Sequence, residues 1–76
     1  MVSLSELLVN EKGTIHSFTI GRTETNRLAS LGFTPGAHVN MTQNYGRGPL
    51  IVIVRGTRVA LSRLEANQIF VVRNSS

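Results

Sequence analysis

The sequence contains no cysteine, no aspartate and no tryptophan, and Lys12 is its only lysine. Because cysteine is absent, disulfides, thiolate zinc sites and cysteine nucleophiles are excluded. The four acidic residues are all glutamates, so no Ser-His-Asp arrangement is possible. No apolar run approaches the about 20 residues that a membrane span needs, and the N-terminus lacks the apolar core of a signal peptide. We therefore expect a soluble, cytoplasmic protein that does not span a membrane.

The 76 residues predict a single domain, 1–76, with residues 73–76 as a loose C-terminal tail. Apolar side chains make up 41% of the chain, which is enough for a core and too many for a disordered protein. The formal net charge is +4, and every basic residue except Lys12 is an arginine. This balance is typical either of a solvated basic surface or of a protein with an anionic partner.

Short strands are predicted to alternate with small helical segments. The predicted elements are a helical turn at 4–8, a strand at 14–20, a helix at 22–31, strands at 37–44, 50–55 and 58–62, a helical turn at 63–66 and a strand at 68–73. Ser3-Leu-Ser-Glu6 and Ser62-Arg-Leu-Glu65 fit capping boxes, and Thr23 is a candidate cap. About five short strands, with a helical insertion between the first two, predict a mainly β fold and a small, partly open barrel.

The run from Leu28 to Gly36 predicts the end of a helix followed by a tight turn. Leu28 and Leu31 lie on one helix face, and Gly32 stands where a left-handed C-cap is usual. Pro35-Gly36 is a strong turn signal. These residues carry no reactive group. We therefore assign them a structural role in which Leu28, Leu31 and the neighbouring Phe33 hold the helix to the barrel.

The segment 50–62 predicts a β-hairpin. With Gly56-Thr57 as a two-residue loop of type II′, Arg55 faces Arg58 and Val54 faces Val59. Side chains alternate between the two faces of a strand. The core face then consists of Leu50, Val52, Val54, Val59 and Leu61, and the outer face of Ile51, Ile53, Arg55, Arg58, Ala60 and Ser62.

Two isoleucines on an outer face require an explanation. Either the first helix or a neighbouring strand covers them, or they belong to a surface that binds a partner. Apolar side chains edged by arginine are common in protein-binding surfaces. We interpret Ile51, Ile53, Arg55 and Arg58 as such a partner-binding surface.

The sequence offers little for catalysis or for metal binding. His16 and His38 fall on different predicted strands, and no metal-ligand motif is present. Gly46-Arg47-Gly48 precedes a strand rather than a helix, which favours an ordinary loop over a phosphate loop. We therefore predict neither an enzyme nor a bound cofactor or metal.

Four pieces of sequence together resemble the FeoA family. They are Leu28-x-x-Leu31-Gly32-x-x-Pro35-Gly36, Gly48-Pro49-Leu50, Val54-Arg55-Gly56-x-x-Val59-Ala60-Leu61 and Glu65-Ala66-x-x-Ile69-x-Val71. The resemblance covers roughly residues 4–73. It implies an SH3-like β-barrel and a cytoplasmic accessory protein of bacterial ferrous iron transport. The implied partner is FeoB, a membrane transporter with a cytoplasmic GTP-binding domain. No catalytic residues come with the family.

Two alternatives remain beside this interpretation. The basic charge is compatible with a small barrel that binds nucleic acid. His16 and His38 are the candidate ligands of a transition-metal sensor. Whatever the function, an edge strand of so small a barrel offers a site for weak pairing with a second copy of the chain.

Overall fold

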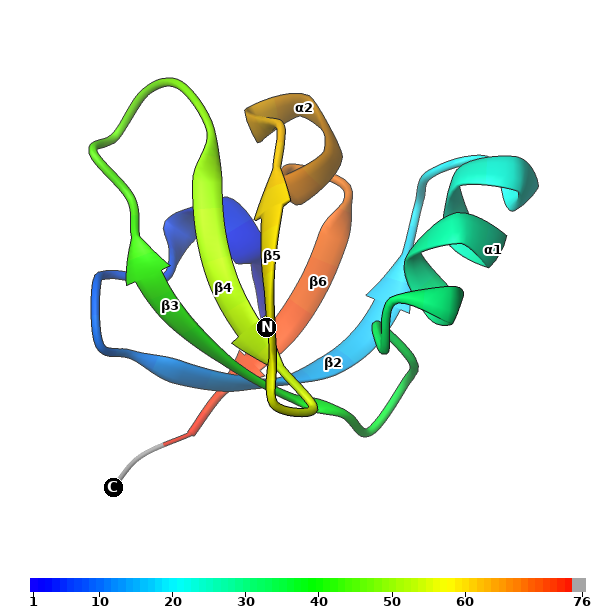
Figure 1. Cartoon of the computed structure of the whole chain (residues 1–76), viewed down its shortest axis with the longest axis horizontal. Coiled ribbons are helices and arrows are strands. Elements are labelled where there is room, and N and C mark those ends of the chain that lie inside the picture. Colours follow the sequence, from blue (N-terminus) through cyan, green and yellow to red (C-terminus); the bar gives the residue numbers. More distant parts are fainter. Residues whose placement is uncertain (75–76) are drawn as a thin grey trace.

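The computed structural model describes residues 1–74, which form one six-stranded antiparallel sheet with the order β1-β6-β2-β3-β4-β5. The strands are β1 (Val2–Ser3), β2 (Lys12–Phe18), β3 (His38–Gln43), β4 (Leu50–Val54), β5 (Thr57–Leu61) and β6 (Ile69–Arg73). The helices are the 3₁₀ turn η1 (Leu4–Glu6), α1 (Arg22–Ser30) and α2 (Arg63–Ala66). Figure 1 shows the strands curling around the core as a small barrel. The predicted mainly β fold is confirmed.

The core follows from the period-two pattern of the strands. In β3, Val39 and Met41 are buried while His38 is exposed, as the alternation predicts. In β4, Leu50, Val52 and Val54 are all buried. The sheet curls where its register shifts, at Ile15/Ser17 and at Met41/Gln43, because a bulge bends the strand that contains it. The buried residues of the described chain are all apolar.

The N-terminal segment differs from its prediction. Residues 4–8 were expected to form a helical turn, but the turn η1 ends at Glu6, and Leu8 is 68% exposed. The segment before it forms β1, a strand that was not predicted and that pairs Val2 with Val71 of β6. Two residues are too short for an alternation pattern to show in the sequence.

The first long strand and the cap of the first helix also require correction. The strand was predicted at 14–20, but β2 spans Lys12–Phe18. Gly13 is buried against β6, which allows a close approach of the two backbones. Thr23 does not cap α1, because the N-cap is Gly21. Thr25 donates instead to the Ile20 carbonyl at 3.3 Å.

The run from Leu28 to Gly36 forms the predicted helix end and turn. Phe33 N–H donates to the Leu28 carbonyl and Gly32 N–H to that of Ala29, each at 3.0 Å, with Gly32 at φ +105°. These are the two bonds of a Schellman motif. Ala37 N–H then donates to the Thr34 carbonyl across Pro35-Gly36, which closes the predicted turn.

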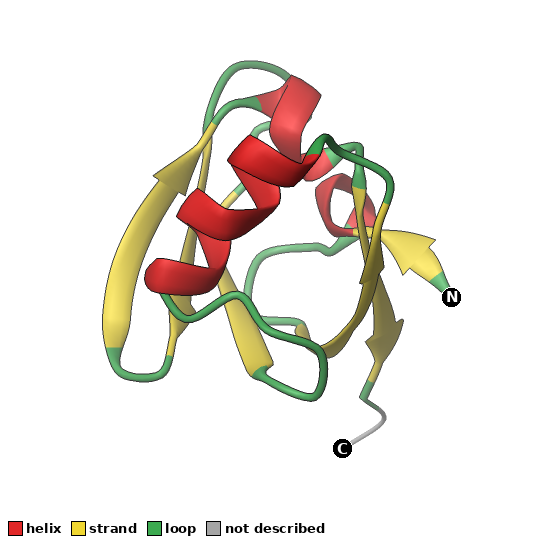
Figure 2. Cartoon of the chain, turned by 90° about the vertical axis from the view of Figure 1, so that its right-hand side faces the viewer, coloured by secondary structure: helices red, strands yellow, loops and turns green. Residues whose placement is uncertain are grey.

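Only part of the predicted helix anchor is buried. Leu28 and Phe33 are fully buried in the core, whereas Leu31 is 37% exposed. Leu31 is the C-cap residue and lies past the last helical turn, so it does not follow the face of Leu28 inward. Figure 2 shows α1 lying along one side of the barrel.

The β4–β5 hairpin is displaced from its predicted register. The loop is Arg55-Gly56, with φ of +48° and +77°, and Val54 pairs with Thr57. Two positive φ values define a type I′ turn rather than the predicted type II′. Moving a two-residue loop by one position shifts the pairing of the two strands by two residues, so that Val59 lies opposite Val52 instead of Val54. Because side chains alternate with a period of two, each residue keeps its face. The predicted core face is therefore confirmed. Arg58, which was predicted to lie opposite Arg55, lies opposite Ile53.

The C-terminal part supplies α2 and the strand β6, which pairs with β1 and β2. Ser62 and Glu65 form the predicted capping box at the start of α2, with Glu65 N–H donating to Ser62 Oγ at 3.1 Å. Strand β6 includes Arg73, and Asn74 N–H donates to the Lys12 carbonyl at 3.0 Å. The last two residues of the predicted tail, 75–76, lie outside the described part. Among the described helices, none is long and apolar enough to cross a membrane.

Candidate docking face

A row of four side chains crosses the outer face of the sheet. Lys12 of β2 pairs with Asn40 of β3, Asn40 pairs with Ile53 of β4, and Ile53 pairs with Arg58 of β5. Neighbouring strands lie about 4.8 Å apart, so these four residues from distant parts of the sequence form one continuous strip. We call this strip the outer row.

The two isoleucines belong to this outer face. Ile51 and Ile53 are half-buried, while their neighbours Leu50, Val52 and Val54 are fully buried on the other face. Neither isoleucine is among the partly buried side chains that pack against the core. The outer row therefore combines apolar surface from β4 with polar and charged side chains from the strands on either side.

An open pocket of about 380 Å³ lies beside Ile53 on this face. Its lining residues are Lys12, His38, Val39, Asn40, Ile53, Arg55, Gly56 and Asn74. No carboxylate is among them. Sequence reasoning missed Lys12, Asn40 and Asn74 as site residues, because their proximity depends on strand order, which local patterns do not report. The outward positions of His38 and Asn40 were the one available signal.

Arg55 makes intramolecular contacts. Its Nε donates to the Gly32 carbonyl at 3.2 Å and its Nη2 to Thr34 Oγ1 at 2.8 Å. A Cβ placed on Gly32 would lie 3.2 Å from Arg55 Cδ, so the arginine stem covers this glycine. The predicted pairing of Arg55 with Arg58 is wrong. Arg55 connects the hairpin loop to the end of α1.

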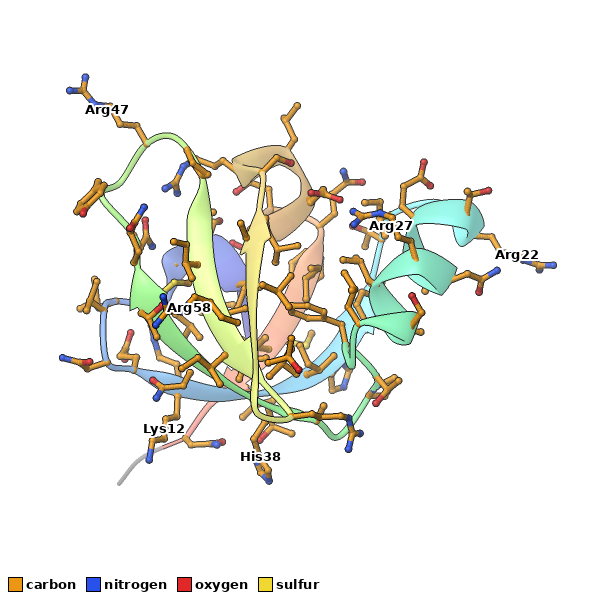
Figure 3. The ribbon with its side chains drawn as sticks, viewed as in Figure 1. Lys12, Arg22, Arg27, His38, Arg47 and Arg58 are labelled. Atoms are coloured by element: carbon orange, nitrogen blue, oxygen red, sulfur yellow. The ribbon has the colours of Figure 1, made fainter. Side chains whose placement is uncertain are left out.

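Only some of the charged side chains form ion pairs or side-chain hydrogen bonds. Glu11 forms an ion pair with Arg73, and Glu65 forms one with Arg27. In the described part of the chain, four cations have neither an ion pair nor a side-chain hydrogen bond, namely Lys12, Arg22, Arg47 and Arg58. Lys12 and His38 project from the same side of the molecule, whereas Arg22 and Arg47 lie at distant corners (Figure 3). The outer row thus holds two of these cations, Lys12 and Arg58.

The histidines lie apart from any cluster of metal ligands. His38 Nδ1 is 3.2 Å from Thr14 Oγ1, and His16 Nδ1 is 3.0 Å from Ser17 Oγ. Both rings are exposed. Among residues 1–74, no three histidine or glutamate side chains come together as potential metal ligands. A shared metal site of the two histidines stays a hypothesis without geometric support.

Comparison with known families and structures gives a consistent result. A model of the FeoA domain matches residues 2–73. No curated protein matches the chain. The crystal structure of an iron uptake regulatory protein, FeoA, superimposes with a TM-score of 0.90 at 32% identity, covering 96% of this chain and 97% of that one.

Two further structures share the fold. The zinc complex of Stenotrophomonas maltophilia FeoA has a TM-score of 0.81 at 33% identity, covering 93% of this chain and 89% of that one. That protein is described as a prokaryotic SH3 domain protein with a suggested role as a bacterial ferrous iron transport activating factor. A manganese-dependent transcriptional repressor matches with a TM-score of 0.85 at 19% identity, covering 95% of this chain but 41% of the repressor, which shows the fold alone.

Proposed function

Since the chain belongs to the FeoA family, we propose that it is an accessory protein of bacterial ferrous iron transport. It acts in the cytoplasm, by contact with the cytoplasmic part of a FeoB-type membrane transporter, and catalyses no reaction itself. The match of the FeoA domain over residues 2–73 carries this proposal.

We assign this contact to the outer row together with Ile51, which lies two residues from Ile53 along β4. Ile51 and Ile53 supply apolar area, and Arg58 supplies a charged edge with no partner of its own among the described residues. Partly apolar surfaces that contain arginine are favoured in protein interfaces. Arg55 contributes by holding the hairpin loop against the end of α1.

Calorimetric titration of the protein with the purified cytoplasmic domain of FeoB from the same organism tests the proposal. We expect Ile53→Glu to weaken binding by about tenfold or more, because it introduces a charge into the apolar part of the contact. The matched control is Leu64→Glu, which alters an apolar side chain of α2 that is 76% exposed. We expect this control to bind like the original protein.

Arg58→Glu keeps the test decisive if Ile53→Glu fails to fold. Arg58 is exposed on an edge strand, so its replacement leaves the core intact. Circular dichroism checks the fold of each variant. The proposed function is wrong if the original protein does not bind the domain. The assigned surface is wrong if Arg58→Glu and Ile53→Glu both fold and bind normally.

A further inference from the structure

The pocket beside Ile53 has a consistent electrostatic character. The cations Lys12 and Arg55 line it from β2 and the hairpin loop, and Arg58 flanks it as the neighbour of Ile53. Three of the four glutamates are engaged elsewhere, and the fourth, Glu24, lies on α1 and does not line the pocket. Glu11 is paired with Arg73, Glu65 with Arg27, and Glu6 accepts from Ser3 N–H at 3.1 Å. The pocket is therefore a place where positive charge is not balanced by the described chain itself.

Asn40 gives the pocket an unused polar group. Its Oδ1 is buried and has no hydrogen-bond partner among residues 1–74. This oxygen accepts hydrogen bonds, so it does not itself bind a carboxylate, which is also an acceptor. The two ends of an amide side chain exchange by a 180° rotation, and Asn40 can therefore also donate to an incoming oxygen.

The shape of the pocket favours a side chain over a free small molecule. The pocket is open to solvent, and Ile53 forms an apolar border beside the polar groups. Ile51 continues this border two residues along β4, about 6.8 Å away. A protein segment with one acidic side chain and an apolar neighbour would place the acidic group in the polar pocket and the apolar group against Ile51 and Ile53.

We infer that this pocket receives a carboxylate side chain from the partner protein, with Lys12 and Asn40 as its contacts and Ile51 and Ile53 holding an adjacent apolar side chain. The inference rests on the proposed function for the identity of the partner, a FeoB-type cytoplasmic domain. The charge complementarity of the pocket identifies the chemistry of the group that it binds.

A first experiment tests the pocket without any partner. Asn40→Asp places a carboxylate of the same shape inside the pocket, and Asn26→Asp makes the same change on the exposed surface of α1. We expect Asn40→Asp to raise the Tm by about 4 °C or more at low salt, and to exceed the change in the control. A Tm below that of the original protein would overturn the preference of the pocket for a carboxylate.

A second experiment identifies the occupant. In titrations with the FeoB cytoplasmic domain, we expect Lys12→Glu and Asn40→Asp to weaken binding by about tenfold or more. The matched control Arg22→Glu reverses an unpaired cation on α1 and should bind within about twofold of the original protein. Equal losses in Lys12→Glu and Arg22→Glu would show a general charge effect and overturn the inference.

The remaining outcomes are also decisive. If the original protein does not bind the domain but Asn40→Asp is stabilised, the proposed function and the assigned occupant fail, while the anion preference of the pocket stands. Vesicles containing phosphatidylserine serve as the competing probe. Binding to these vesicles that Lys12→Glu abolishes, without binding to the domain, would show that the pocket faces a lipid surface and would overturn the inference.

Discussion

Arg55 is the residue at which two parts of the sequence motif meet. It occupies the first position of the hairpin loop at φ +48°, a conformation that costs a non-glycine residue about 1–2 kcal/mol. Its guanidinium donates to the Gly32 carbonyl and to Thr34 Oγ1, and its stem covers Gly32. The helix end and the hairpin loop therefore depend on each other, although 23 residues separate Gly32 from Arg55.

Two substitutions of Arg55 separate its hydrogen bonds from its backbone strain. Arg55→Ala removes the bonds and keeps the strained conformation, so we expect the free energy of unfolding to fall by about 1–2 kcal/mol. Arg55→Gly also removes the bonds but relieves the backbone strain, so its free energy of unfolding should fall by about 1 kcal/mol less than that of Arg55→Ala. Urea denaturation measures both values, with Arg58→Ala as the control. Equal losses in the two Arg55 variants would show that the φ value carries no cost.

At the level of elements, α1 is attached to the barrel by few contacts. Leu28 is its only buried residue, and the other faces of the helix are largely exposed. Arg27 extends from α1 to Glu65 of α2, and Arg55 holds the turn that follows the helix. Glu65 has two functions, because its Oε1 caps α2 at Ser62 N–H and its Oε2 pairs with Arg27.

The two functions of Glu65 can be measured separately. Glu65→Gln keeps a side chain that can complete the capping box but loses the ion pair, so we expect a loss of about 0–1 kcal/mol for a partly exposed pair. Glu65→Ala loses both and should cost about 0.5–2 kcal/mol. Urea denaturation gives these values, and Arg27→Ala should match Glu65→Gln. A Glu65→Gln protein as unstable as Glu65→Ala would assign the whole effect to the ion pair.

The hairpin shows how far sequence reasoning reaches. Alternating side chains predicted the buried set of β4 and β5 correctly, because burial depends only on which residues share a face. The loop position depended on one choice between Arg55-Gly56 and Gly56-Thr57. A glycine is compatible with either, and the contacts of Arg55 with Gly32 and Thr34 favour the first. These contacts are tertiary, so no local pattern contained them.

The residues of the outer row likewise could be predicted only where local sequence patterns bring them together. Ile53 and Arg58 were found because a hairpin brings them together locally. Lys12 and Asn40 join them through the pairing of β2 with β3 and of β3 with β4. This neighbourhood is set by the order of strands in the sheet, which the spacing of apolar residues does not determine.

At the scale of the whole molecule, positive charge is dispersed. The chain spans 30 × 25 × 23 Å. Of the four unpaired cations among the described residues, Lys12 and Arg58 share the outer row, whereas Arg22 and Arg47 lie at distant corners (Figure 3). Nucleic-acid binding domains instead gather their cations on one face or along one helix. A dispersed pattern allows only a few simultaneous phosphate contacts, and each contact contributes to the salt dependence of binding.

This arrangement predicts weak and salt-sensitive binding to nucleic acid. We expect fluorescence anisotropy with a random duplex of about 20 base pairs to show no saturation at about 150 mM salt, with the protein at about 100 µM. At low salt, the slope of log K against log salt should be shallow, about −2 to −3, which corresponds to two or three phosphate contacts. The FeoB cytoplasmic domain provides the comparison. The contact that we propose with it includes the apolar side chains of Ile51 and Ile53, so we expect this binding to persist at the higher salt. Submicromolar affinity for the duplex with a slope of about −5 or steeper would support a nucleic-acid-binding barrel instead.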